Sequence, residues 1–312
     1  MKKFFKKILN KLFFYYYEKD IFLKGKILSN NNKNKKLINN LSCVEFSVFS
    51  QWGEDGIIDW LISQFRYIPK IFIEFGVGDY LESNTRFLIK NRNWKGLILE
   101  SNKEDVLKIK SDPIYWKHDL IVKNIFIKKN NINEIIKRNL KNLEVGLLSV
   151  DLDGNDYWII EHIKCVKPYI IVCEYNAILG DKKMLTVPYN ENFNRKSEHY
   201  SNLFFGTSIN ALRDLMNKKG YSFIGTNSNG VNAFFIRNNY AKRVLKKIRN
   251  IKSFPSRFRE SRDNKGEKNF VRGFDRINII KNKKILDLNN KKILPLSKIK
   301  NIYSTEWKKE IN

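Results

Sequence analysis

Five short apolar runs between residues 70 and 175 constrain the fold of this chain most. Each run has the length of a strand buried on both faces, and most segments between the runs can hold a helix. Short buried strands separated by crossovers of about a dozen residues or more form a parallel sheet covered by helices. The sequence therefore predicts an α/β fold. The predicted strands span residues 70–75, 96–100, 114–117, 145–151 and 169–175.

The pattern changes after the fifth run. Residues 208–219 predict a helix with Ser208 as its cap and Gly220 as its stop. Residues 221–226 and 231–237 predict two strands joined by Asn227-Ser228-Asn229-Gly230, a hairpin signal. The expected sheet is therefore seven-stranded and mostly parallel, with an antiparallel hairpin at its C-terminal end.

Composition divides the chain into three predicted parts. Residues 1–40 comprise a basic amphipathic helix over 1–17 and a linker rich in Asn and Lys over 25–40. Residues 41–240 form the main domain, which suits a chain of 312 residues with one large core. Residues 241–312 form a basic extension that starts with a helix around 240–249. Its segment 256–263 is so densely polar that we expect a solvated surface.

The formal charge of +27 comes from 59 Lys and Arg against 32 Asp and Glu. It suits an anionic partner, but lysine, asparagine and isoleucine abound everywhere, as an AT-rich coding sequence alone would produce. None of the RNA-binding module signatures appears, so we expect no nucleic-acid partner. The N-terminal helix either lies on an anionic membrane surface or packs on its own domain.

Cysteines and histidines indicate an intracellular protein without a zinc site. Cys43, Cys165 and Cys173 lack metal-ligand spacing and predict buried thiols in a reducing compartment. The three histidines are scattered, and no stretch approaches the roughly 18 to 20 apolar residues of a membrane-spanning helix. We expect a cytoplasmic location, either free or peripheral at the inner face of the membrane.

Glu74-Phe75-Gly76-Val77-Gly78-Asp79 places a glycine turn directly after the first predicted strand. Glycines at a strand's carboxyl end let a ligand approach the backbone closely. The flanking acids disfavour a pyrophosphate and favour a cationic ligand, and the third glycine of a dinucleotide fingerprint is absent. The alternative is an ordinary junction between a strand and a helix.

Acids recur at the ends of all five predicted strands, where ligands bind in a doubly wound sheet. Glu100 lies 22 residues after Gly78, close to the spacing at which an acid pairs with ribose hydroxyls. The strand-end acids are Glu74, Asp79, Glu100, Asp119, Asp151, Asp153 and Glu174.

Three motifs carry a family resemblance. The glycine turn resembles the first motif of class I S-adenosylmethionine-dependent methyltransferases. Ser50-Gln51-Trp52-Gly53-Glu54-Asp55 looks like the Ser-Gln-x-Gly-Glu-Asp opening of FkbM-like methyltransferases. Ser149-Val150-Asp151-Leu152-Asp153-Gly154 is similar to their Lys-Ile-Asp-x-Glu-Gly motif, with Ser149 for the lysine and Asp153 for the glutamate. The resemblance covers roughly residues 49–237 and implies a Rossmann-like class I methyltransferase fold with S-adenosylmethionine as cofactor.

The resemblance also implies roles for individual residues. The methionine part of the cofactor would lie on the glycine turn, the ribose on Glu100 and the adenine near Asp119. The segment before the first strand would close over the methionine end. The implied cofactor-binding residues are Gln51, Asp55, Glu74, Gly76, Gly78, Glu100, Asp119 and Asp151.

Methyl transfer to a hydroxyl requires a base. Asp153 and Asp151 are the first candidates because they follow the fourth strand, and His199, in the long segment 176–207, is another. Asp153 could equally cap the turn that follows it. Asp151, Asp153 and Asp156 offer the oxygen ligands that magnesium prefers, but no metal is predicted.

The resemblance implies O-methylation of a hydroxyl on a sugar or another small molecule, in the assembly of a surface polysaccharide. The charge keeps open an RNA-binding protein or RNA methyltransferase, which needs a basic face with interleaved aromatics. A third reading is a non-catalytic, membrane-docked interaction protein with the same fold. The acceptor and the oligomeric state stay open.

Overall fold

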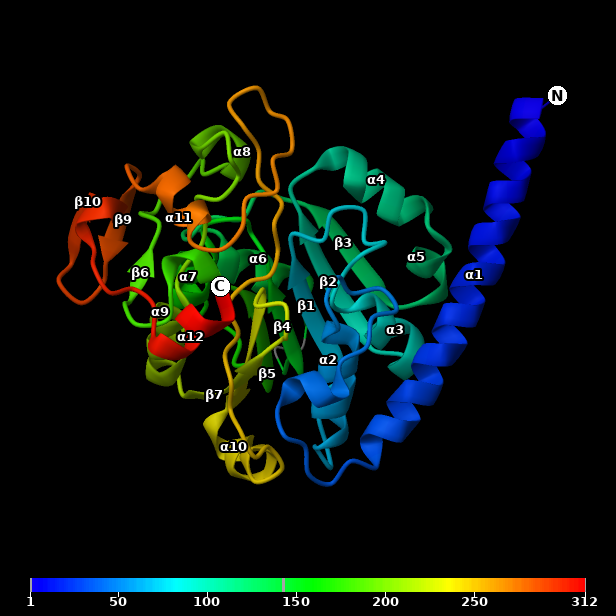
Figure 1. Ribbon diagram of the computed structural model, residues 1–312. Coiled ribbons are helices and arrows are strands. Elements are labelled where there is room, and N and C mark those ends of the chain that lie inside the picture. The colour runs from blue at the N-terminus through cyan, green and yellow to red at the C-terminus, as the bar shows by residue number, and fades with distance from the viewer. Residues whose placement is uncertain (1, 142–143, 312) are drawn as a thin grey trace.

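The computed structural model describes residues 2–141 and 144–311 and confirms the predicted architecture. Its main sheet contains β1 (Ile71–Phe75), β2 (Lys95–Glu100), β3 (Leu120–Asn124), β4 (Leu147–Val150), β5 (Ile170–Glu174), β7 (Tyr221–Thr226) and β8 (Asn232–Arg237). The strand order is β3-β2-β1-β4-β5-β8-β7. The first five strands are parallel, and β8 lies antiparallel between β5 and β7. This is a Rossmann-like sheet ending in the expected hairpin (Figure 1).

Both faces of the sheet carry a hydrophobic core, which explains the continuous apolar runs. In β1, Ile73 and Phe75 face one core while Phe72 faces the other. The first core is covered by α6 (Ile132–Asn139), α7 (Asp156–His162) and α9 (Ile209–Lys218). The second is covered by α2 (Glu54–Ser63), α3 (Arg86–Arg92), α4 (Lys103–Ser111) and α10 (Asn238–Leu245).

The third strand lies later than predicted. Residues 114–117 belong instead to a short helix, α5 (Pro113–Lys117). The Asp112 carboxylate caps this helix by accepting from the Ile114 N–H at 2.8 Å, and proline at the first helical position is preset for it. The strand prediction for 114–117 was therefore wrong, and Asp119 precedes β3 rather than following it.

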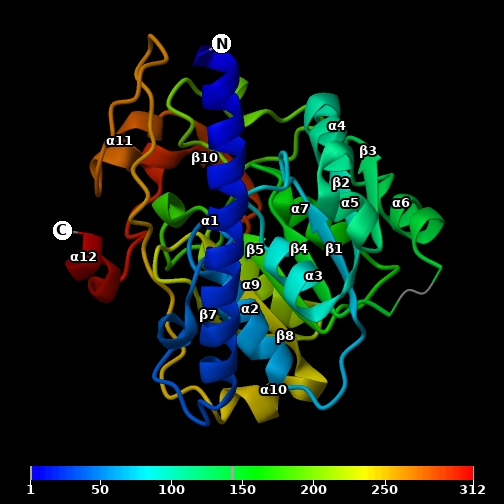
Figure 2. The same ribbon diagram turned by 90° about the vertical axis from the view of Figure 1, so that its right-hand side faces the viewer.

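Helix α1 (Lys2–Lys33) is longer than predicted and replaces much of the linker expected at residues 25–40. Its second half packs on the domain, since a Cβ at Gly25 would lie 2.4 Å from Val48 Cγ2. Its N-terminal end stands apart from the sheet domain in Figure 1, and Figure 2 shows α1 from the side that faces away from the domain. The amphipathic pattern was predicted over residues 1–17. The side chains of residues 1–15 lie outside the part of the chain that the structure describes.

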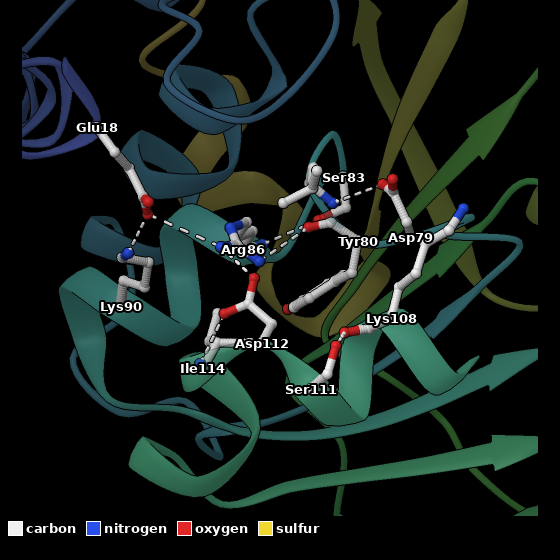
Figure 3. A network of polar contacts seen from close by, with 11 residues as sticks. Glu18, Asp79, Tyr80, Ser83, Arg86, Lys90, Lys108, Ser111, Asp112 and Ile114 are labelled. Atoms are coloured by element: carbon white, nitrogen blue, oxygen red, sulfur yellow. Dashed lines mark hydrogen bonds and ion pairs between the residues drawn. The ribbon is translucent and has the colours of Figure 1, made fainter. Parts of the chain in front are cut away.

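An ion-pair network centred on the buried Arg86 fastens α1 to the domain (Figure 3). Arg86 on α3 lies 2.8 Å from Asp112 and 3.8 Å from Glu18 of α1. Lys90, one turn further along α3, also bonds to the Glu18 carboxylate. Because the Arg86 side chain is almost fully buried, the loss of Asp112 would leave a poorly compensated charge.

A second, three-stranded antiparallel sheet joins distant parts of the chain. It contains β6 (Leu185–Thr186) from the long segment after β5, and β9 (Lys284–Asp287) and β10 (Lys292–Pro295) from the predicted C-terminal extension. Ile280 of α11 (Asp275–Ile280) and Trp307 of α12 (Thr305–Ile311) are buried in the first core. The extension is thus packed on the main domain. Segment 256–263, expected to be solvated, contains the fully buried Ser261.

All three cysteines are free thiols. Cys173 is buried as predicted and Cys165 is half-buried, whereas Cys43 is exposed, which corrects the prediction for that residue. Among the residues that the structure describes, no helix has both the length and the apolar content required to cross a bilayer.

Candidate active site

Two cavities meet at the carboxyl ends of β1 and β4, where the strand order of the sheet reverses and ligands bind in folds of this kind. The cavity of about 390 Å³ beside Gly76 and Gly78 is called the glycine-turn cavity. The cavity of about 410 Å³ beneath residues 256–262 is called the strap cavity, and those residues the strap. The two cavities share Gly76, Asp151, Asp153, Arg195 and Lys196.

The glycine turn requires its glycines. Gly76 has a φ of +68°, and a Cβ there would lie 1.7 Å from the Asp151 carbonyl oxygen. Gly78 has a φ of +56° but faces open space. The turn therefore packs tightly against the end of β4 at Gly76 and leaves room for a ligand at Gly78.

Glu100 lines the glycine-turn cavity. Its Oε2 accepts from the Gly78 N–H at 3.0 Å, and its Oε1 accepts from the Asn102 N–H at 2.8 Å. Leu99, Ile125, Phe126 and Ile127 form an apolar wall of the same cavity. A carboxylate beside an apolar wall suits a ligand that combines hydroxyl groups with a flat apolar ring.

Two predicted cofactor ligands, Glu74 and Asp55, are buried and line neither cavity. Glu74 accepts from the Asn84 N–H at 2.9 Å and from the Thr85 hydroxyl, and burial raises its pKa to about 7. Asp55 Oδ2 accepts from three consecutive backbone N–H groups, Val48 to Ser50, and burial raises its pKa to about 7. Both carboxylates hold loops near the site, which corrects the expectation of direct cofactor contact.

The segment around Gln51 is held in place by its acidic neighbours. Glu54 Oε2 accepts from the Trp52 N–H at 2.8 Å, and Glu54 Oε1 accepts from the side-chain amides of Asn227 and Asn232. This ties the segment to the β7–β8 hairpin and places Gln51 and Trp52 in the wall of the strap cavity. Gln51 is therefore near the site, on the side of the strap cavity.

Asp119 lies at the amino end of β3, whereas both cavities border the carboxyl ends of strands. It precedes β3, is 57% exposed and pairs with Lys95 at 2.7 Å. The expected role at the adenine side depended on the misplaced third strand. Ile125, Phe126 and Ile127, which do follow β3, line the glycine-turn cavity instead.

Three carboxylates gather where the two cavities meet. Asp151 and Asp153 follow β4, Glu174 ends β5, and one oxygen of each lies within 4.8 Å of the others. Arg195 Nη1 lies 2.6 Å from Asp153 Oδ1 and 3.9 Å from Glu174 Oε1. The Arg195 guanidinium also stacks on Phe205, 3.6 Å from the ring centre, which fixes its position.

The acid cluster is defined as Asp151, Asp153 and Glu174, and burial raises the pKa of two of its members. Burial, followed by the neighbouring Asp153 carboxylate, raises the pKa of Asp151 well above its usual range. Burial, followed by Asp151, does the same to the pKa of Glu174. Glu174 is 8% exposed, and its Oε2 has no hydrogen-bond partner within the described residues.

Two other predicted residues lie outside the cluster. Asp156 accepts from the N–H groups of Leu152 and Gly154 at 2.7 and 3.0 Å, so it shapes the loop after β4. His199 Nδ1 lies 2.7 Å from Ser201 Oγ, and His199 lines neither cavity. The structure thus brings Asp151 and Asp153 together with Glu174, in place of Asp156 and His199.

The strap is the part of the site that sequence reasoning missed. Its even-numbered residues Ser256, Phe258, Glu260 and Arg262 line the strap cavity, while Arg257 and Arg259 are exposed. Buried Arg276 holds the strap by donating to the carbonyl oxygens of Ser256 and Phe258, both at 2.8 Å. The signal was the alternation itself, which is typical of an extended segment with one covered face.

No family model matches this chain, and no curated protein matches it. Among solved structures, it is similar to the N-terminal domain of EvdMO1 with SAH bound, at 9% identity and a TM-score of 0.40, covering 70% of this chain and 94% of that one. It is also similar to an S-adenosylmethionine-dependent methyltransferase from Clostridium acetobutylicum, at 9% identity and a TM-score of 0.36, covering 59% and 90%. Roles for site residues therefore depend on the geometry of this chain itself.

Proposed function

We propose that this protein is an S-adenosylmethionine-dependent methyltransferase that methylates a hydroxyl group of a sugar or another small molecule. The observation that carries the proposal is the meeting of two cavities of similar size at Gly76 and the acid cluster. One cavity suits a nucleoside-containing donor and the other an acceptor. The resemblance of the sequence motifs to FkbM-like methyltransferases supports the same assignment.

The glycine-turn cavity would hold the donor. Glu100 is placed to accept hydrogen bonds from ribose hydroxyls, and the wall around Phe126 to pack on adenine. Bound S-adenosylmethionine supplies a methyl group on a sulfonium that leaves readily. The negative potential of Asp151 and its neighbours favours a ligand with positive charge over one with a phosphate.

The strap cavity would hold the acceptor. Its volume of about 410 Å³ lies within the range of small-molecule sites, and the strap covers it. Asp151 borders both cavities, so its carboxylate is placed to take the hydroxyl proton as the new bond forms. Asp153 is already paired with Arg195 and serves less well as the base.

Calorimetry with purified protein and fresh S-adenosylmethionine tests the donor half of the proposal. We expect binding to the wild type and a loss of at least tenfold in affinity for Glu100→Ala, because the ribose hydroxyls lose their carboxylate acceptor. Glu104→Ala, an exposed acid nearby on α4, is the matched control. Absence of binding to the wild type would contradict the proposal, and steeply salt-dependent RNA binding would favour the RNA alternative.

We also propose a peripheral membrane contact through α1. Leu23 and Ile27 are 59% and 53% exposed, four residues apart, and Lys24 and Lys26 lie between them. An apolar stripe flanked by lysines suits an anionic lipid surface. Co-sedimentation with phosphatidylserine vesicles should fall strongly for Leu23→Glu/Ile27→Glu, and equal binding of variant and wild type would contradict this contact.

A further inference from the structure

The acid cluster gathers three carboxylates beside one cation. Three carboxylates have an oxygen within 4.8 Å of one another, and Arg195 is the cation that forms ion pairs with them among the described residues. A single guanidinium thus lies beside three carboxylates, and it contacts them from the side of Asp153 Oδ1 and Glu174 Oε1.

Glu174 supplies an independent observation. It is 8% exposed, and its Oε2 is buried without a hydrogen-bond partner although the side chain lines the strap cavity. Its nearest cation, Arg195 Nη1, is 3.9 Å from the other oxygen, Oε1. A buried carboxylate oxygen with no partner is costly unless a ligand satisfies it.

The spacing of the three carboxylates fits a hard divalent cation. Oxygen ligands lie about 2.0–2.1 Å from Mg²⁺ and about 2.3–2.6 Å from Ca²⁺, so ligands on opposite sides of an ion are about 4–5 Å apart. The upper limit of 4.8 Å in this cluster falls within that range. Three protein ligands leave further positions open toward the strap cavity for water or for acceptor hydroxyls.

We propose that Asp151, Asp153 and Glu174 bind one divalent cation of the oxygen-preferring class, Mg²⁺, Mn²⁺ or Ca²⁺, at the junction of the two cavities. Each carboxylate contributes one oxygen, so the second oxygen of Asp151 stays available for the hydroxyl proton. The cation binds the acceptor hydroxyl as a Lewis acid and lowers its pKa, which eases removal of that proton. This catalytic role rests on the proposed methyltransferase function, whereas cation binding itself does not.

The first test is a titration of chelator-treated, full-length protein with Mn²⁺, followed by electron paramagnetic resonance of free Mn²⁺ in the absence of S-adenosylmethionine. We expect one site per chain in the wild type and a loss of at least tenfold in affinity for Glu174→Gln and for Asp151→Asn. Glu260→Gln, which also lines the strap cavity but lies outside the cluster, should bind Mn²⁺ like the wild type. Competition by Mg²⁺ and Ca²⁺ shows which ion is preferred.

Binding of S-adenosylmethionine to each variant, measured by calorimetry, separates a lost ligand from a misfolded chain. Glu174→Gln should keep cofactor binding, since Glu174 does not line the glycine-turn cavity. No stoichiometric Mn²⁺ site in the wild type, or unchanged Mn²⁺ affinity in Glu174→Gln, overturns the cation site while leaving the methyltransferase proposal standing. Mn²⁺ binding without any cofactor binding would overturn the proposed function alone.

Discussion

Glu74 offers a direct test of how the fold holds a buried acid next to the site. Its side chain is 3% exposed and accepts hydrogen bonds from Asn84 and Thr85. Burial is the largest cause that raises its pKa from 4.5 to about 7. Glu74→Gln keeps the shape of the side chain and one acceptor oxygen but removes the titrating proton.

The magnitude follows from the shift in pKa. A raised pKa means that the folded protein binds the proton more tightly than the unfolded chain does. The stabilisation is therefore fully present below pH 4.5 and is lost as the pH rises through about 7. Between pH 5 and pH 8, Glu74 alone lowers the free energy of unfolding by about 2.5 kcal/mol. The Glu74→Gln variant has no titrating group at this position, so it does not show this decrease in the free energy of unfolding.

Urea unfolding followed by tryptophan fluorescence, at several pH values between 5 and 8, measures the effect. The stability of Glu74→Gln relative to the wild type should rise by about 2.5 kcal/mol across this range. Glu104→Gln, at an exposed position of α4, controls for the loss of one charge. A difference between wild type and Glu74→Gln that is the same at both ends of the pH range would refute the reasoning.

Three further predictions follow from the same geometry. Gly78→Ala should lower the free energy of unfolding by roughly 1–2 kcal/mol, because its backbone has a left-handed conformation. Gly76→Ala should lower it well beyond that, because a Cβ at Gly76 would also clash with a backbone carbonyl. Chemical denaturation of the two variants measures the difference. Asp55→Ala should cost about 3 kcal/mol, since three backbone N–H groups lose their acceptor, and the same assay checks this. Arg276→Met should raise the rate of amide hydrogen exchange across the strap without altering exchange in β1, because two carbonyl oxygens of the strap lose their donor. An unchanged exchange rate in the strap would contradict this role of Arg276.

The main sheet could be predicted because its signals are local. Strands buried on both faces give continuous apolar runs, and the Asn-Gly-containing turn marked the hairpin within one residue of its observed bounds. The third strand could not be placed, because a helix cap at Asp112 followed by Pro113 outweighed the apolar run after it. The linker prediction failed for α1 because Asn and Lys composition says nothing about packing, and buried Ser29 and Asn32 lie in its last turns.

The candidate site was predictable only where a strand end and a side chain coincide. Gly76, Gly78, Glu100 and Asp151 line one cavity because parallel strands end at one edge of the sheet. The sequence cannot tell whether a buried acid faces a cavity or a neighbouring backbone N–H, so Glu74 and Asp55 were predicted to contact the cofactor. Arg276 and the strap were missed because they reach the site from more than 75 residues beyond β5.

The strap also bears on how the ligand preference of such a protein could diverge. Because alternate residues line the cavity, inserting a single residue directly after Ser256 would exchange the inward set for the outward one in the rest of the strap. Arg257 and Arg259 would then replace Phe258 and Glu260 in the lining of the cavity. The strap's contribution to that lining would change from mixed to positively charged. A one-codon change far from the glycine turn could thus make the strap cavity suit anionic ligands, while the sheet and the glycine turn stay as they are.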